Sequence, residues 1–193
     1  KGRHTGRRIY TVTLEERATC PKSCVHWYDC YGNTMPFAHR LQYDSHLIKR
    51  MDKELAYLNT KPYGILIRLH VLGDFPDIKY VEQWVKWLDK YPNIACYGYT
   101  AHSPKESIGD RIAQMNRDNW DRWSVRFSNY PRYKLSANSD KISKNGIICP
   151  EQAGQTSSCG SCGLCWNKTS KPILFMTHSY DLRKGKSNAN SKQ

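Results

Sequence analysis

The stretch Gly64-Ile65-Leu66-Ile67-Arg68-Leu69-His70 is apolar at almost every position. A run like this is typical of a β-strand that is covered on both faces, as strands of parallel sheets are. Residues 71–76 (VLGDFP) follow as a tight loop, and Asp77 can then cap a helix. The apolar positions of that helix recur at helical spacing: Ile78, Val81, Trp84, Val85 and Leu88. This part of the chain therefore predicts a strand, a loop and a helix in succession.

The same succession recurs on either side of this stretch. Strands are predicted at residues 9–14, 64–70, 94–100, 123–128, 146–148 and 173–178. Asp44 or Ser45 can cap an earlier helix, and Ser103-Pro104-Lys105-Glu106 has the form of a capping box with proline at the first helical position. Strand and helix thus alternate at least three times. The fold class predicted is α/β, with parallel strands and helical crossovers in a sheet that is open or curled into a partial barrel.

Seven of the eight cysteines stand in two groups. The later group has the spacing C-x9-C-x2-C-x2-C and consists of Cys149, Cys159, Cys162 and Cys165. The earlier group follows the first predicted strand and consists of Cys20, Cys24 and Cys30. Both groups fall at the carboxyl ends of predicted strands, the edge where parallel sheets gather their chemistry. The loop with Gly73 and Asp74 and the residue His102 are predicted to lie at the same edge.

Thiolates two residues apart can converge on one metal centre, and the glycines between them let the backbone wrap closely around it. Iron–sulfur clusters and zinc are the two centres that use such ligands. The repeated C-x2-C-x2-C favours a [4Fe–4S] cluster, because structural zinc usually takes two separated C-x2-C pairs. Zinc remains the alternative, followed by a disulfide framework. The three earlier thiols could hold a second cluster with one iron open to a small molecule, or complete a single cluster with the later thiols.

The charge balance indicates the kind of partner. The chain of 193 residues has 30 basic and 17 acidic residues, a formal net charge of +13. Such a surface attracts polyanions, so nucleic acid is the expected partner, and a host or viral protein is another. The alternative is a solvated basic surface with no cognate ligand. No apolar run approaches a membrane span and no signal peptide is visible, so we expect no membrane partner and a cytoplasmic location, in the host cell if the protein is viral.

The length suits one domain. We expect a mobile basic arm at residues 1–8, a single α/β domain at residues 9–183 that includes the cysteine-rich loop 149–166, and a disordered basic tail at residues 184–193.

Several polar side chains occur within the predicted sheet. Arg68 and Arg126 lie mid-strand, and an arginine inside a sheet needs an anionic partner, so a carboxylate or phosphate is expected nearby. His70 is interpreted as a histidine of the core or the sheet edge. His102 and His178 are two further candidates for a fourth cluster ligand. Cys96 has no cysteine neighbours in its strand and is interpreted as a buried apolar thiol.

Motifs in this order resemble those of a family of bacteriophage-encoded, radical-SAM-like proteins. The matching pieces are Thr19-Cys20-Pro21, Cys24, Cys30-Tyr31-Gly32, Arg68-Leu69-His70, Gly73-Asp74-Phe75, Tyr99-Thr100, Ser103, Cys149-Pro150, Cys159, Cys162, Cys165-Trp166 and His178. They extend from residue 19 to residue 178. The resemblance implies a partial (β/α) barrel of the radical-SAM type.

The same resemblance implies roles for individual residues. Cys20, Cys24 and Cys30 would hold a [4Fe–4S] cluster whose open iron takes S-adenosylmethionine. Gly73 and Asp74 would meet the amino group of that molecule. The four later cysteines resemble an auxiliary cluster. The first motif here is C-x3-C-x5-C, whereas the superfamily uses C-x3-C-x2-C, so the resemblance implies the fold and the cluster and leaves catalysis, and any catalytic residue, open.

The sequence therefore predicts a phage-type iron–sulfur protein, with one cluster or two, that is associated with nucleic acid. The alternative is a non-catalytic nucleic-acid-binding or regulatory protein that a cluster or zinc stabilises.

Overall fold

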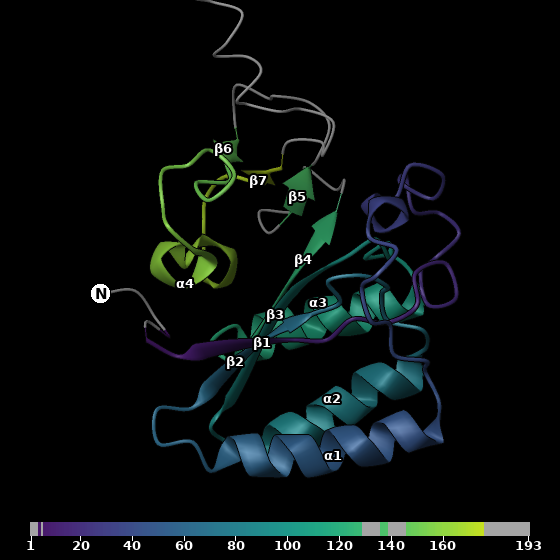
Figure 1. Ribbon diagram of the computed structural model, residues 1–193, viewed down its shortest axis with the longest axis vertical. Coiled ribbons are helices and arrows are strands. Elements are labelled where there is room, and N and C mark those ends of the chain that lie inside the picture. The colour runs from purple at the N-terminus through teal and green to yellow at the C-terminus, as the bar shows by residue number, and fades with distance from the viewer. Residues whose placement is uncertain (1–3, 5, 129–135, 139–145, 176–193) are drawn as a thin grey trace, which may run out of the picture.

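Four parallel strands form the centre of the molecule. A computed structural model describes residues 4, 6–128, 136–138 and 146–175. Strands β1 (Arg8–Thr11), β2 (Ile65–Leu69), β3 (Ile94–Thr100) and β4 (Trp123–Ser128) lie side by side in chain order (Figure 1). The sheet continues with β5 (Ser136–Asn138), β7 (Ile173–Leu174) and β6 (Ile147–Ile148), and each neighbouring pair is parallel. The prediction of an α/β fold with a parallel sheet is confirmed.

Three helices make the crossovers between the first four strands. They are α1 (Ser45–Asn59), α2 (Ile78–Lys90) and α3 (Ser107–Asn119). Asp44 caps α1 by accepting a hydrogen bond from the Leu47 amide, and Asp77 caps α2 in the same way through the Tyr80 amide, as predicted.

The prediction that the capping box opens α3 is wrong. Residues 103–106 form a turn, in which the Glu106 amide donates to the Ser103 carbonyl, and the helix begins at Ser107. The turn folds back onto the helix so closely that a Cβ built at Gly109 would lie 1.9 Å from the Ser103 carbonyl oxygen. This close packing fixes the turn in place of a first helical turn.

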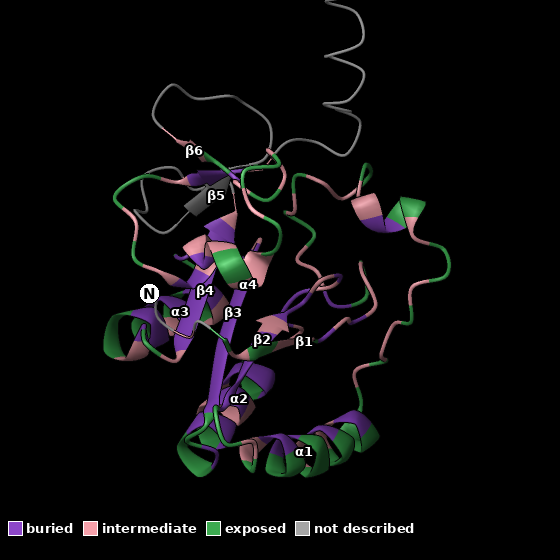
Figure 2. Ribbon diagram, turned by 60° about the vertical axis from the view of Figure 1, so that its left-hand side comes forward, coloured by how far each residue is buried: buried purple, intermediate pink, exposed green. Residues whose placement is uncertain are grey.

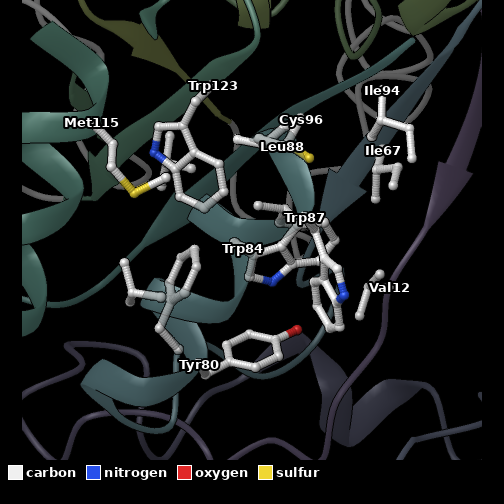
Figure 3. Packing of buried hydrophobic residues seen from close by; sticks show 14 of the residues in the cluster. Val12, Ile67, Tyr80, Trp84, Trp87, Leu88, Ile94, Cys96, Met115 and Trp123 are labelled. Carbon is white, nitrogen blue, oxygen red and sulfur yellow. The ribbon is translucent and has the colours of Figure 1, made fainter. Parts of the chain in front are cut away.

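The helices cover one face of the sheet and build the main core there. Its largest buried side chains are aromatic and include Tyr80, Trp84, Trp87 and Trp123 (Figure 3). Alternate residues of the strands complete this core, so the buried positions follow the central strands while the outer side of α1 is exposed (Figure 2). Cys96 is 1% exposed within this core, which confirms its interpretation as a buried thiol.

The opposite face of the sheet, which we call the inner face, has a smaller core of Leu66, Ala95, Tyr97 and Trp166. Trp166 comes from the cysteine-rich segment beyond β4. Its ring lies edge-on to that of Tyr97, with ring centroids 4.9 Å apart. The C-terminal segment therefore covers part of the face that the helices leave open.

The ends of the predicted strands differ from the observed ones. β1 ends at Thr11, and residues 12–14 continue alongside the loop after β2, where the Leu14 amide donates to the Leu72 carbonyl. β5 was not predicted. The predicted last strand keeps Ile173 and Leu174, while residues 176–178 and the tail 184–193 lie outside the described residues. Within the expected arm, Arg8 begins β1. No helix in the described part of the chain has the length and apolar character needed to cross a membrane.

Candidate metal centre

The first cysteine loop, residues 14–41, leaves the sheet after β1 and returns to it before α1. Its ends meet at a bridge between Leu14 and Leu41. Arg40 closes the loop from inside with two hydrogen bonds to the Glu16 carboxylate, at 2.6 and 2.8 Å. The same guanidinium donates to the carbonyl oxygens of Gly32, Met35 and Ala38. These hydrogen bonds therefore hold the loop in a defined conformation around its three cysteines.

Cys20, Cys24 and Cys30 lie near one another within this loop, and each is partly exposed. Burial raises the pKa of the Cys20 thiol to about 12, and the charges of Asp74, Cys24 and Cys30 add to that rise. Burial is also the main cause of the raised pKa of Cys24, with Asp74 and Cys30 again among its neighbours. Because thiols bind metals as thiolates, a metal at this loop would displace these protons.

Asp74 fastens the first cysteine loop to the edge of the sheet. The carboxylate accepts hydrogen bonds from the Thr100 hydroxyl at 2.8 Å and from the amides of Phe75 and Ala101 at 2.8 and 2.7 Å. The Asp74 amide donates to the Thr19 hydroxyl, next to Cys20. Burial raises the pKa of Asp74, and the three donated hydrogen bonds oppose that rise. These contacts hold the loops after β1, β2 and β3 together.

Gly73 and His102 belong to the same junction. Gly73 has a φ of +80° and packs against Leu14 and Thr19 so tightly that only glycine fits without displacement. The Nε2 of His102 lies 2.8 Å from the Phe75 carbonyl oxygen, and its Nδ1 lies 3.8 Å from Glu106. The structure thus brings Gly73, Asp74 and His102 together beside the first cysteine loop. Their contact with a cofactor stays a prediction.

The second cysteine loop, residues 149–166, has its own local order. Its short helix α4 (Cys159–Cys162) is capped by Ser158, which forms a capping box with Ser161. Gly163 ends the helix in the left-handed region, with a φ of +70°, and the 3-10 helix η2 (Leu164–Trp166) follows. The C-x2-C-x2-C spacing is therefore wound around one compact turn of backbone.

Arg126 docks this loop on the inner face. Its guanidinium is fully buried and donates to the carbonyl oxygens of Cys165 at 2.9 Å, Asn167 at 2.7 Å and Leu164 at 3.3 Å. The expectation that Arg126 has an anionic partner is wrong, because backbone carbonyls satisfy it. The Tyr99 hydroxyl donates to the Cys165 sulfur at 2.9 Å, and burial is the main cause that raises the pKa of this thiol to about 11.

Each cysteine loop brings its own thiols close together. The pKa of Cys159 is influenced by Cys149 and Cys162, and that of Cys165 by Cys149 and Cys159. In the first loop, the pKa of Cys20 is influenced by Cys24 and Cys30. All eight cysteines are free thiols, so a disulfide framework is absent. In the described part of the chain, no three Cys, His, Asp or Glu side chains are arranged to hold a single metal ion.

Several residues of this site carried no clear signal in the sequence. Arg40 and Thr19 act through contacts across a loop, and no periodicity marks them. Tyr99 could have been found, because it alternates with Tyr97 on the face of β3 that the helices do not cover. Arg68 also lies on this face, opposite Tyr97 in the register of β2 and β3.

His70 is a buried histidine at the end of β2, as interpreted. It has a φ of +54°, and its ring stands edge-on to that of Phe75. Its Nδ1 is buried, and no hydrogen-bond partner faces it among the described residues. Burial lowers the pKa of His70 to about 3, and the charge of His102 contributes.

This lowered pKa predicts a loss of stability in mild acid. An unfolded histidine has a pKa near 6.5, so below that pH the unfolded chain binds a proton that the folded chain does not. From pH 7.5 to pH 5 we expect the wild type to lose about 2 kcal/mol of unfolding free energy more than His70→Asn, whose side chain tolerates a positive φ. Urea unfolding at both pH values measures this. Equal losses in the two proteins would show that His70 does not titrate in this way.

The fold and the site together define a parallel α/β protein with two cysteine-rich loops. The family model described as Gene product 88 matches residues 3–116, more than half of the chain. The chain therefore belongs to the Gene product 88 family, and its predicted phage-type character is confirmed at that level. The match includes the first cysteine loop, whereas β4 and the second cysteine loop lie beyond it. Comparison with curated proteins and with solved structures gives no match.

Proposed function

We propose that the protein binds iron–sulfur clusters through its two cysteine loops. The observation that carries this proposal is that three thiols and four thiols gather separately on one protein. Both loops lie on the side of the sheet away from α1 and α2 (Figure 1). Cysteine thiolates are the standard ligands of [4Fe–4S] clusters, and four of them complete one cluster. The second cysteine loop would hold a complete cluster, and the first would hold one with an open iron.

The donor set fits a cluster better than it fits zinc. Zinc draws four ligands around one ion at about 2.3 Å each, whereas a cluster spreads its thiolates over different iron atoms. The Tyr99 hydroxyl at Cys165 is the kind of hydrogen bond that orients a ligand and adjusts its charge.

The connectivity supports the finer proposal of a radical-SAM-type architecture. Strands β1 to β4 follow one another in space as they do in the chain, with all three helices on one face, which is the connectivity of a (β/α) barrel. The first cysteine loop sits at the carboxyl end of β1, where such barrels carry their chemistry. When bound, a cluster with an open iron would supply a coordination site and an electron for S-adenosylmethionine.

Within this proposal the residues of the chain bind and orient. Cys20, Cys24 and Cys30 would hold three irons, and the Asp74 junction would fix their loop against the sheet. By resemblance, the Gly73–Asp74 segment would face the amino group of S-adenosylmethionine. Three hydrogen-bond donors of the protein already occupy the oxygens of the Asp74 carboxylate. The main effect of that carboxylate would therefore be to position the backbone of residues 73–74.

Metal content after anaerobic purification tests the proposal. We expect a brown protein that absorbs near ~400 nm and holds about eight irons for two cubane clusters. Replacing Cys20, Cys24 and Cys30 with serine, or the four later cysteines with serine, should each leave about four irons. Cys96→Ala is the matched control and should keep them all, because Cys96 lies in the helix-side core.

Two results would contradict parts of this proposal. A colourless protein that contains stoichiometric zinc would contradict the proposal of an iron–sulfur cluster. An iron-loaded, reduced protein that forms no 5′-deoxyadenosine from S-adenosylmethionine would remove the radical chemistry and leave a cluster-stabilised protein.

A groove between α1 and α2 favours a second function, which is nucleic-acid binding. The groove has a volume of about 530 Å³ and is lined by Ile48, Lys49, Asp52, Lys53, Gln83, Lys86, Trp87 and Lys90. Lys90 pairs with Asp52 at 3.0 Å. Lys49, Lys53 and Lys86 are exposed and have no carboxylate within salt-bridge distance among the described residues. Three unpaired ammonium groups in one groove suit the phosphates of a nucleic-acid backbone.

Charge reversal in this groove tests the nucleic-acid proposal. Because each phosphate contact adds about 0.9 to the salt dependence of binding to duplex DNA, the triple variant Lys49→Glu, Lys53→Glu, Lys86→Glu should lower the slope by about three. Fluorescence anisotropy with a short DNA duplex at several salt concentrations measures this. The matched control reverses three exposed lysines outside the groove, Lys22, Lys105 and Lys168. An equal loss in both variants would show that the groove is no specific site.

A further inference from the structure

Arg68 stands out because its guanidinium has no hydrogen-bond or salt-bridge partner among the described residues. It lies on β2 between Thr11 of β1 and Tyr97 of β3, which are its neighbours in the register of the sheet. Ile67 and Leu69 on either side of it belong to the helix-side core, so the Arg68 side chain lies on the inner face. The side chain is partly buried.

Arg126, two strands away on the same face, provides the contrast. Its guanidinium donates to three backbone carbonyls and the Thr169 hydroxyl. Arg68 has neither a hydrogen bond nor a carboxylate partner among the residues that the structure describes. An arginine in a sheet keeps its charge and all five donors, so a partly buried one without acceptors costs stability unless a ligand supplies them.

The groups that raise the pKa of Arg68 come from three parts of the chain. They are Tyr31 of the first cysteine loop, Cys159 of the second, and Tyr97 and Tyr99 of β3. Phenols are neutral at physiological pH, so the tyrosines leave the positive charge uncompensated. Thr11, the neighbour of Arg68 on the edge strand, is exposed.

We propose that Arg68 is the anchor of an oxyanion site on the inner face, which takes the carboxylate or phosphate group of a small molecule held between the two cysteine loops. A guanidinium fork matches either group with two parallel hydrogen bonds. The aromatic rings around it would exclude water and strengthen this interaction. The occupant would lie near both loops, because Tyr31 and Cys159 are each close enough to Arg68 to influence its pKa. The site needs no metal, since the sheet positions Arg68 and Tyr97.

Equilibrium dialysis with labelled inorganic phosphate and labelled malonate tests this site and distinguishes the two sources of the oxyanion. We expect one saturable site per chain for at least one probe. Arg68→Gln should raise the Kd for the bound anion tenfold or more, which is the loss expected when a charge-assisted pair of hydrogen bonds is removed. Arg68→Lys keeps the charge but loses the paired donors of the guanidinium, so its affinity for the anion should lie between those of the wild type and Arg68→Gln. Arg117→Gln on α3 and the triple lysine variant of the groove should bind as the wild type does.

Three outcomes would overturn the proposal. They are the absence of a saturable site for either probe, unchanged binding in Arg68→Gln, and loss of binding when the protein is loaded with iron. The last would show that the metal-bound Cys159 thiolate is the partner of Arg68. Circular dichroism of each variant separates misfolding from loss of the site. Iron content is measured on the same samples, so a failure of cluster binding is seen independently of a failure of anion binding.

Discussion

Replacing Arg126 with methionine is expected to lower the free energy of unfolding by about 3 to 5 kcal/mol. The guanidinium is fully buried and is the donor for the carbonyls of Leu164, Cys165 and Asn167. Methionine fills much of the volume but removes the guanidinium as donor to the carbonyls of Cys165 and Asn167, while the Leu164 carbonyl keeps the Asn167 amide. Each unsatisfied buried group costs about 1 to 3 kcal/mol. Urea unfolding followed by tryptophan fluorescence measures the loss.

The same variant should also release the second cysteine loop from the inner face. Under native conditions its thiols should then react faster with a thiol-specific reagent. Arg122→Met is the matched control, because Arg122 also donates to three backbone carbonyls, those of Leu88, Tyr91 and Ile94, away from both cysteine loops. It should be destabilised while its thiols react as in the wild type. Equal thiol reactivity in the two variants would refute the docking role of Arg126.

Gly73→Ala is expected to have the second large effect, a loss of about 3 kcal/mol that combines backbone strain with overpacking. The added Cβ would lie 2.6 Å from the Thr19 hydroxyl oxygen and 2.7 Å from the Cβ of Leu14. Both contacts belong to the start of the first cysteine loop. Since neither neighbour is a flexible chain end, the loop has to move away from the sheet.

Gly154→Ala isolates the strain in this prediction. Gly154 also has a positive φ, +67°, but a Cβ there meets no atom within 4 Å. It should cost only about 1 kcal/mol, the typical penalty for a side chain in the left-handed region. The difference between the two variants in urea unfolding then measures the packing of the first cysteine loop. Similar losses in both would mean that this loop is not held by Gly73.

Much of the fold followed from the periodicity of the sequence. The apolar positions of α1 and α2 face one large core, and the strands β2 and β3 are covered on both faces, so their pattern is strong. β1 was predicted to end three residues too late, because residues 12–14 keep strand-like alternation while they pair with a loop. The start of α3 was missed because tertiary packing at Gly109 outweighs the local capping signal.

The candidate site was predicted as a set of residues but not as an arrangement. The spacing of the cysteines identified both loops, because sequence neighbours remain neighbours in a tight turn. The partners of the two arginines could not be predicted, since Arg126 takes backbone carbonyls that no residue type reveals. The resemblance identified a phage-type family, which the Gene product 88 match confirms. The cluster and the radical-SAM architecture stay proposals.

The contacts that Cys165 and Trp166 make with Tyr99 and Tyr97 of β3 have a consequence for the order of folding. Strands β1 to β4 each pair with the next strand along the chain, so the sheet can grow one unit at a time during synthesis. The contact between Tyr99 and Cys165 spans 66 residues and closes only after β4 has formed. We therefore expect the four later thiols to stay open to a metal donor until the last stage of folding. On the proposal that both loops bind clusters, the first loop would be loaded early and the second late.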